Sequence, residues 1–203
     1  MSKKPIIVFE GIEGSGKTLH INNVVKYLKK INKKYIKLRE PGGSKNAEKI
    51  RKIILNNKSN FNKITDLLLY LSARSENVEK IIEKNYRKKI ILIDRFIDST
   101  LAYQHYGMGI NKKLINNLNK FILNKIKPDF TFLNVVNKNN LTIRLNKRIV
   151  KNRYDKFDYN FYNKVQNGFI KIAKNKNNYL IINSNNNIKD NKKLIINKII
   201  SLI

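Results

Sequence analysis

One eight-residue segment, GIEGSGKT at positions 11–18, constrains the fold of this chain more than any other feature. It matches the phosphate-loop pattern G-x-x-x-x-G-K-[ST] in full, between an apolar run at 5–10 and a segment of helical periodicity at 17–30. Glycines let backbone N–H groups point into one concavity, and the following helix adds the positive end of its dipole. A glycine turn without a ligand is the alternative, but the strand-then-helix context favours a nucleoside triphosphate site. Its residues are Gly11, Ile12, Glu13, Gly14, Ser15, Gly16, Lys17 and Thr18.

Four side chains near this loop suit phosphoryl transfer. Lys17 supplies a charge to the β and γ phosphates, and Thr18 is placed to ligate Mg²⁺. Asp94 and Arg95 directly follow a second apolar run, IILI at 90–93. An acid at the end of a neighbouring strand completes the magnesium shell in phosphate-loop proteins, and an arginine there steadies an anionic acceptor. The alternative for this pair is a surface Asp–Arg that caps a helix.

Short apolar runs alternate with helical patterns along the whole chain. Strands are expected at 5–10, 35–38, 90–93, 130–136 and 179–183, and helices at 17–30, 47–55, 64–84, 98–105, 111–126, 141–150, 158–173 and 192–203. This alternation predicts a five-stranded parallel sheet with helices on both faces, and ligands at the carboxyl ends of its strands. The length of 203 residues and the lack of an internal repeat predict one domain over residues 1–203.

The net charge of +29, from 43 Lys and Arg against 14 Asp and Glu, suggests a polyanionic partner. The composition offers another explanation: 35 Lys, 33 Asn and 32 Ile stand against four Ala, which AT-rich codons impose at tolerant positions. The lysines are spread along the chain, and arginine, the residue preferred for bidentate phosphate contacts, numbers only eight. We therefore favour mutational drift and expect no nucleic-acid partner.

Composition also limits the chemistry and the compartment. Cysteine is absent, which excludes a structural disulfide, a thiolate nucleophile and a Cys-type zinc site. The two histidines, His20 and His105, are too few for a His-rich metal cage. No apolar run approaches the roughly 18 residues of a membrane span. We expect a soluble protein of a reducing compartment, the cytoplasm by default.

Several further motifs resemble bacterial thymidylate kinases. After GIEGSGKT come REPGG at 39–43, Ala73-Arg74, DRFIDSTLAYQ at 94–104 and Lys127-Pro128-Asp129, in the family's order. The resemblance covers about residues 5–173 and implies the α/β fold of P-loop nucleoside monophosphate kinases, with a small lid. It further implies a kinase that uses ATP and Mg²⁺ to phosphorylate dTMP to dTDP, toward dTTP, and that forms a homodimer through apolar helix faces, including residues 64–84.

The resemblance assigns tasks to particular residues. Tyr70 would stack on thymine, where relatives commonly have Phe, and Arg74 would donate to a thymine carbonyl; their spacing of four puts both on one helix face. Thr100 and Gln104 share this spacing and would contact the base. The remaining substrate-binding residues would be Arg95 and Arg51 at the monophosphate, Glu40 and Glu13 near the sugar phosphate and magnesium, and Tyr103 beside the deoxyribose. For Tyr70 and Tyr103 the alternative is an ordinary core aromatic.

The arginine aimed at the transferred group is expected in a lid at about residues 144–158. Some thymidylate kinases carry this arginine in the phosphate loop, where this chain has Gly14. The segment resembles the bacterial lid, and Arg153 is the first candidate and Arg148 the second for a catalytic role beside Lys17, Arg95 and Glu13. The alternative is a solvated basic helix end.

Three positions depart from the family pattern. Leu19 replaces a second Thr after the phosphate loop, Phe96 replaces the usual Tyr after Asp-Arg, and Val135 stands where relatives commonly have Asp. Two other functions stay open on sequence alone: a kinase for another pyrimidine deoxynucleotide, dUMP included, or for a deoxynucleoside, and a basic nucleic-acid-binding ATPase.

Overall fold

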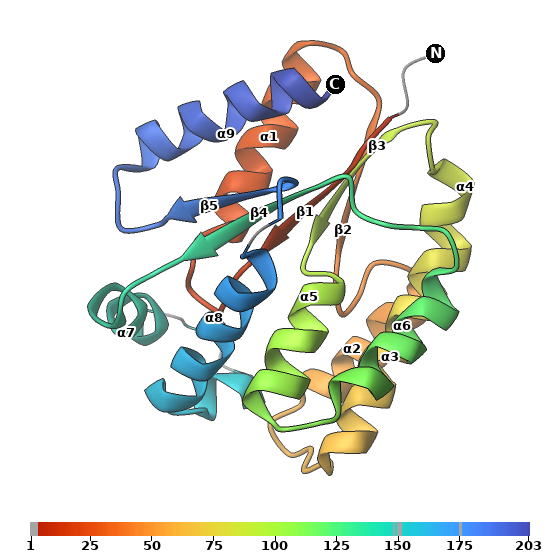
Figure 1. Ribbon diagram of the computed structural model, residues 1–203, viewed down its shortest axis with the longest axis vertical. Coiled ribbons are helices and arrows are strands. Elements are labelled where there is room, and N and C mark those ends of the chain that lie inside the picture. The colour runs from red at the N-terminus through yellow and green to blue at the C-terminus, as the bar shows by residue number, and fades with distance from the viewer. Residues whose placement is uncertain (1–3, 148, 150–151, 175) are drawn as a thin grey trace.

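The sheet predicted from the sequence is present in the computed structural model, which describes residues 4–147, 149, 152–174 and 176–203. Five parallel strands lie in the order β2-β3-β1-β4-β5, as Figure 1 shows. Their bounds are β1 Ile6–Glu10, β2 Tyr35–Arg39, β3 Ile90–Asp94, β4 Phe130–Val135 and β5 Tyr179–Asn183. Each lies within a residue of the predicted range. The strands β1, β3 and β4 are apolar runs buried on both faces, which are a strong strand signal.

Helices cover both faces of this sheet. Successive residues of a strand point to opposite faces, so Ile7 and Phe9 pack against α1 (Lys17–Lys30) and α9 (Ile188–Leu202), at the top of Figure 1. Ile6 and Val8 pack toward the other face. The helices on that side are α3 (Lys63–Asn77), α4 (Glu83–Asn85), α5 (Ile97–Thr100), α6 (Lys112–Leu123) and α8 (Tyr159–Ala173).

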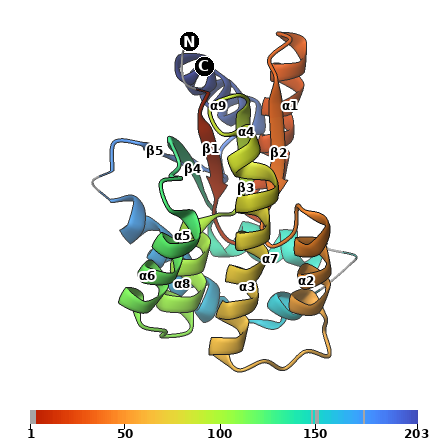
Figure 2. The same ribbon diagram turned by 90° about the vertical axis from the view of Figure 1, so that its right-hand side faces the viewer.

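The remaining elements surround the carboxyl ends of the strands. The helix α2 (Lys45–Leu55) packs on α3, and Figure 2 shows the two side by side below the sheet. The helix α7 (Lys138–Asn146) and a 3-10 turn at Arg153–Lys156 follow β4. None of the helices in the described part of the chain is long and apolar enough to cross a membrane.

Two helices differ from their predicted form. The helix expected at 64–84 is α-helical only to Asn77 and continues as a π-helical segment, Val78–Ile82, before α4. The helix expected at 98–105 likewise passes into a π-helical segment, Leu101–Gly107. Apolar periodicity cannot reveal this wider turn, which tertiary contacts stabilise. At the first junction, Asn77 donates from Nδ2 to the Gly42 carbonyl at 2.5 Å and thus joins this helix to the REPGG loop.

Strand register brings the motifs together. Asp94 of β3 is level with Phe9 of β1 and with Arg39 of β2. The phosphate loop, the REPGG loop and the Asp94-Arg95 pair therefore leave the sheet at one edge. In a parallel α/β sheet this is the edge where ligands bind.

Candidate active site

The lysine of the phosphate loop forms hydrogen bonds within the loop itself. The Lys17 ammonium donates to the carbonyls of Gly11 and Ile12, at 2.9 and 2.8 Å, and to Ser15 Oγ at 3.4 Å. Burial and the nearby Arg95 charge lower the pKa of Lys17 to about 8. Gly11 has a φ of 137°, and a Cβ there would lie 2.3 Å from the Asn134 carbonyl oxygen, so only glycine fits. The loop thus holds a buried amine at the N-terminus of α1, ready for phosphate oxygens.

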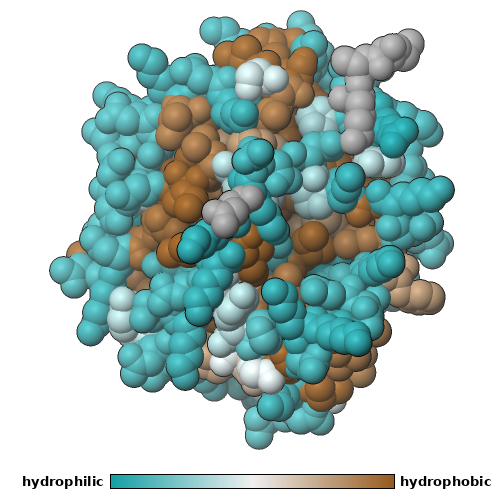
Figure 3. Space-filling view, in the orientation of Figure 1, coloured by the Kyte–Doolittle hydropathy of each residue, from teal (hydrophilic) through white to brown (hydrophobic). Residues whose placement is uncertain are grey.

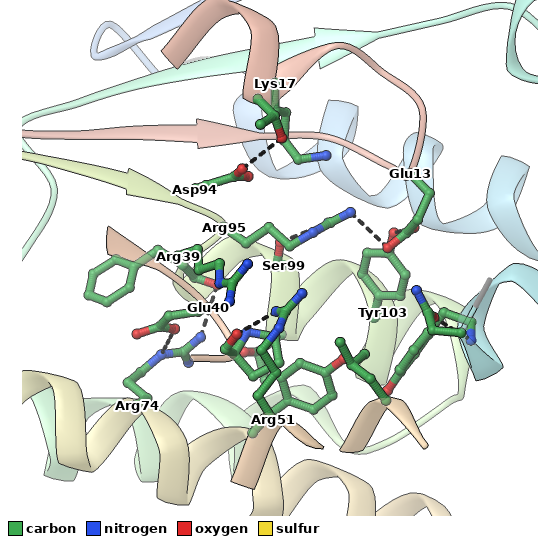
Figure 4. Close-up of a pocket in the computed structure, with 18 of the residues that line it drawn as sticks. Glu13, Lys17, Arg39, Glu40, Arg51, Arg74, Asp94, Arg95, Ser99 and Tyr103 are labelled. Carbon is green, nitrogen blue, oxygen red and sulfur yellow. Dashed lines mark hydrogen bonds and ion pairs between the residues drawn. The ribbon is translucent and has the colours of Figure 1, made fainter. Parts of the chain in front are cut away.

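A pair of oxygen donors lies beside the lysine. Thr18 Oγ1 donates to Asp94 Oδ2 at 3.1 Å, from the first turn of α1 to the end of β3 (Figure 4). Hydroxyl and carboxylate oxygens are the ligands that Mg²⁺ prefers. Among the described residues, no three His, Cys, Asp or Glu side chains gather into a metal cluster. The pair therefore fits an ion that takes most of its ligands from nucleotide phosphates and water.

Arg95 follows β3 and forms hydrogen bonds with the phosphate loop, which follows β1. Its Nη2 donates to Glu13 Oε1 at 2.8 Å (Figure 4), and its Nη1 donates to the Gly11 carbonyl at 2.8 Å. The other Glu13 oxygen accepts from the Tyr103 hydroxyl. Burial opposes ionisation of Glu13, but the charges of Arg95 and Lys17 outweigh it and hold its pKa below the usual value. Glu13 thus stays charged and orients both Arg95 and Tyr103.

Behind Arg95, a buried carboxylate caps α5. Glu10 accepts from the backbone N–H groups of Phe96, at 2.8 Å, and Ser99, at 3.2 Å, and from Ser99 Oγ at 2.5 Å. Burial, and next the charge of Asp98, raise the pKa of Glu10 to about 7. Asp98 in turn accepts from the Tyr179 hydroxyl. This buried pair fixes the turn from which Arg95 extends.

Arg74 links α3 to two loops of the site. Its Nε donates to Glu40 Oε2 at 2.8 Å, Nη1 to Asn119 Oδ1 at 2.5 Å and Nη2 to the Phe96 carbonyl at 3.0 Å. Only 1% of the arginine is exposed, so it sits under the pocket and contributes to its floor. Burial raises the pKa of Glu40, although Arg74 opposes this shift.

Other predicted base contacts lie next to this floor. Thr100 and Gln104 are buried, and Thr100 Oγ1 has no hydrogen-bond partner within the described part of the chain. Gln104 Nε2 reaches Asp66 only at 3.5 Å. Arg51 extends from α2 and donates to the Pro41 carbonyl at 2.5 Å. A buried hydroxyl without a partner favours a ligand atom that completes it.

One pocket gathers the predicted groups from these separate segments. Its wall also contains Arg39, Pro41, Ser99, Asn152 and Tyr154, which the sequence did not single out as site residues. The predicted residues that line it are Glu13, Gly14, Lys17, Thr18, Glu40, Arg51, Tyr70, Arg74, Asp94, Arg95, Thr100, Tyr103 and Gln104.

Comparison with known proteins decides the family. The family model for thymidylate kinase matches residues 9–195. A thymidylate kinase of Wolbachia from Brugia malayi is 42% identical over 200 residues, which are 95% of this chain and 94% of that protein. One from Sulfurihydrogenibium is 40% identical over 95% of each chain. The crystal structure of thymidylate kinase from Ehrlichia chaffeensis superposes with a TM-score of 0.78 at 32% identity, covering 98% of this chain and 99% of that one.

This chain belongs to the thymidylate kinase family. The family's reaction is the ATP-dependent phosphorylation of dTMP to dTDP, with Mg²⁺ as the metal cofactor. The chain is therefore a nucleoside monophosphate kinase, and the fold predicted for it is confirmed.

The lid arginine of this thymidylate kinase family member stays a prediction. Arg153 does not line the pocket: its guanidinium pairs with Asp66 of α3 and donates to the Ile54 carbonyl. Arg148, the second candidate, lies outside the described residues. Arg144, at the end of α7, donates to the carbonyls of Gly14 and Ser184 at 3.0 and 2.7 Å.

Two acids that sequence analysis missed, Glu10 and Asp66, contact other protein groups and do not line the pocket. Glu10 ends β1 and Asp66 lies one helical turn before Tyr70, and both are scarce acids in a basic chain. That scarcity, combined with the spacing of Asp66 from Tyr70 and Arg74, was the signal available for finding them. Phe96, a departure from the family pattern, is buried with its ring centroid 5.3 Å from the Arg74 guanidinium carbon.

Proposed function

We propose that two groups of residues do separate work when this pocket phosphorylates dTMP. One group, at the sheet edge, holds phosphates and metal; the other, on α3 and its neighbours, holds the nucleoside. The observation that carries this assignment is that the phosphate loop shares one pocket with Tyr70, Arg74 and Gln104. Figure 4 shows Arg74 at the opposite end of this pocket from Lys17.

At the phosphate end, charge neutralisation dominates. Lys17 exchanges its contacts with loop carbonyls for the β and γ phosphate oxygens of ATP, while Thr18 and Asp94 hold Mg²⁺. The ion, when bound, neutralises charge that develops on the transferred group. Arg95 and Arg51 hold the dTMP phosphate in line with the γ-phosphate. Glu13 keeps the Arg95 fork turned toward it.

At the nucleoside end, shape and hydrogen bonds select the base. Tyr70 stacks on thymine, and burial raises its pKa, so its hydroxyl stays protonated at neutral pH. Arg74 keeps N–H groups beyond those bound to protein and presents them to a thymine carbonyl. Thr100 Oγ1 takes the base edge as its missing partner, together with Gln104. Tyr103, fixed by Glu13, packs beside the deoxyribose, and Glu40 lies near the sugar phosphate.

A coupled assay of ADP release tests this assignment. Purified protein with ATP and Mg²⁺ is offered dTMP, dUMP, dCMP and dGMP in turn. We expect dTMP to give the highest kcat/KM, with dUMP next, because both present the same carbonyl edge. Turnover of dCMP or dGMP equal to that of dTMP would refute the base assignment.

We also propose that the protein is a cytoplasmic enzyme without a nucleic-acid partner. The support is compositional: no cysteine is present, and the lysines are spread along the chain. The coupled assay with added duplex or single-stranded DNA tests the second part. DNA-stimulated ATP hydrolysis without dTMP turnover would point to a nucleic-acid-binding ATPase, and cell fractionation tests the first part.

We further propose that the protein forms a homodimer through α3 and α6. These packed helices carry exposed apolar stripes, with Ile64 and Leu68 on α3 and Leu114 and Phe121 on α6. Phe121 is 86% exposed, and Figure 3 shows apolar side chains gathered at the lower right, in the region of these helices. Light scattering should give twice the chain mass of 23.9 kDa, and Phe121→Lys should yield monomer. A wild-type monomer at assay concentration refutes the proposal.

A further inference from the structure

A buried carboxylate outside the predicted site joins two parts of the pocket. Asp66, in the first turn of α3, has 2% of its side chain exposed. One oxygen pairs with the Arg153 guanidinium, and the other accepts from the Tyr154 hydroxyl at 2.6 Å. A buried carboxylate is stable only with such partners, and removing either leaves the other group unpaired. Asp66, Arg153 and Tyr154 are called the latch below.

Arg153 is built into protein contacts. Besides Asp66, its Nε donates to the Ile54 carbonyl near the end of α2, where helix carbonyls lack internal partners. Its guanidinium carbon lies 5.4 Å from the centroid of the Phe61 ring. The side chain is 15% exposed and faces a hollow separate from the nucleotide pocket.

Tyr154 connects Asp66 and Arg153 to the nucleotide pocket. Its ring meets Tyr70 and Tyr103 edge to face, with centroids 6.1 and 6.0 Å apart. The residue is 3% exposed, lines the pocket, and its carbonyl accepts from the Tyr162 hydroxyl at 2.9 Å. Tyr154 therefore stands between the ring expected to stack on thymine and the ring expected beside the sugar.

Helix α3 connects the latch to the residues expected to bind the base. Asp66, Tyr70 and Arg74 are spaced by four residues and lie on one face of the helix. Arg74 binds the Glu40 and Phe96 segments, while Asp66 binds the 153–154 turn. One helix face therefore contacts the Glu40 segment, the Phe96 segment and the 153–154 turn, with Tyr70 in the middle of that face.

We propose that Asp66 is a positioning residue for dTMP, and that Arg153 serves it as a latch in place of acting on the transferred phosphoryl group. The latch presses Tyr154 against Tyr70 and so sets the width of the base site. This inference rests on the proposed role of Tyr70 in stacking on thymine. In the described part of the chain, no hydrogen bond or ion pair joins Lys17, Thr18 or Arg95 directly to the latch, so opening it weakens dTMP binding and leaves the transfer step nearly unchanged.

Steady-state kinetics of Asp66→Asn, Arg153→Ala and the double variant test the latch. Each single change should raise KM for dTMP about tenfold and keep kcat within about threefold of wild type. The double variant should show no further rise, because both changes remove the same contact. KM for ATP should stay unchanged in all three.

The opposite pattern would overturn the proposal. If Arg153→Ala lowers kcat by about a hundredfold or more while Asp66→Asn keeps wild-type constants, Arg153 acts on the phosphates. An unchanged KM for dTMP in both single variants overturns it equally. Wild-type turnover with dTMP is the reference, so a failure of the latch is distinguishable from a failure of the proposed function.

Two further variants distinguish loss of the latch from a general folding defect. Tyr154→Phe keeps the ring and the ion pair and removes only the hydroxyl on Asp66; it should raise KM for dTMP about threefold. Should Asp66→Asn fail to fold, this variant decides alone, and an unchanged KM overturns the proposal. The matched control is Asp129→Asn, a carboxylate that accepts from the Ile6 N–H at 2.8 Å, away from the pocket. It should leave both kinetic constants at wild-type values.

Discussion

The phosphate end and the nucleoside end of the pocket are held in place by different parts of the molecule. At the phosphate end, Asp94 and Arg95 extend from the end of β3, and Thr18 extends from the first turn of α1, which follows β1. The register of these two neighbouring strands is set by backbone hydrogen bonds. At the nucleoside end, Arg74 and Asp66 hold loops through side-chain contacts to residues 22 to 88 positions away. We therefore expect the first end to keep its shape when Lys17 or Thr18 is substituted, whereas the second depends on individual side chains for its shape.

The largest expected effect is on transfer at the phosphate end. Lys17→Met removes the charge on the β and γ phosphates and should lower kcat by about a thousandfold or more. Affinity for dTMP should stay within about threefold, since the sheet edge keeps its shape. Coupled ADP release and calorimetry measure the two quantities. Lys29→Met, in the last turn of α1, is the matched control and should behave as wild type.

A second change at this end separates charge from geometry. Arg95→Lys keeps the charge but cannot reproduce the fork that binds both Glu13 and the Gly11 carbonyl. We expect kcat/KM for dTMP to fall about a hundredfold. Arg87→Lys, on a surface residue stacked on Tyr86, should have no effect. A loss below fivefold at Arg95 would show that charge alone suffices there.

The complementary change acts on the nucleoside end. Tyr70→Leu removes the stacking ring, and base–aromatic stacking is worth about 1–3 kcal/mol, so KM for dTMP should rise about tenfold. The value of kcat should change little. Tyr70→Phe keeps the ring and should match wild type. A selective fall in kcat with Tyr70→Leu would mean that the two ends are not separable.

These differences also explain what the sequence can predict. The phosphate loop and Asp94-Arg95 combine local motifs with strand ends, so both their chemistry and their meeting point follow from a parallel sheet. Asp66 and Tyr154 meet across 88 residues through a turn that has no periodic pattern. The π-helical segment likewise begins directly after Asn77, whose side chain contacts Gly42 and Ser44, and leaves no trace in apolar spacing. Long-range side-chain pairing, unlike strand order, has no local signal.

A smaller effect concerns stability and the buried carboxylate behind Arg95. Because burial and Asp98 raise the pKa of Glu10 from 4.5 to about 7, the folded state binds this proton more tightly than the unfolded state. Its stabilising contribution is complete below about pH 4.5 and is lost as pH rises through about 7. Across that range the free energy of unfolding should fall more in wild type than in Glu10→Gln, by on the order of 2 kcal/mol.

Urea denaturation at several pH values measures this difference. Glu79→Gln, at a carboxylate on the exposed surface, is the control and should follow the wild-type profile above pH 5. Parallel profiles for wild type and Glu10→Gln would contradict a raised pKa for Glu10. The sheet edge would then be positioned without help from this carboxyl group.

The most direct test of two separable ends is calorimetric binding of dTMP to two variants side by side. Lys17→Met should bind dTMP with a Kd within about threefold of wild type, although it no longer turns over. Tyr70→Leu should bind it about tenfold more weakly, although it retains transfer. Equal loss of dTMP binding in both variants, or loss confined to Lys17→Met, would contradict the division of the pocket described above.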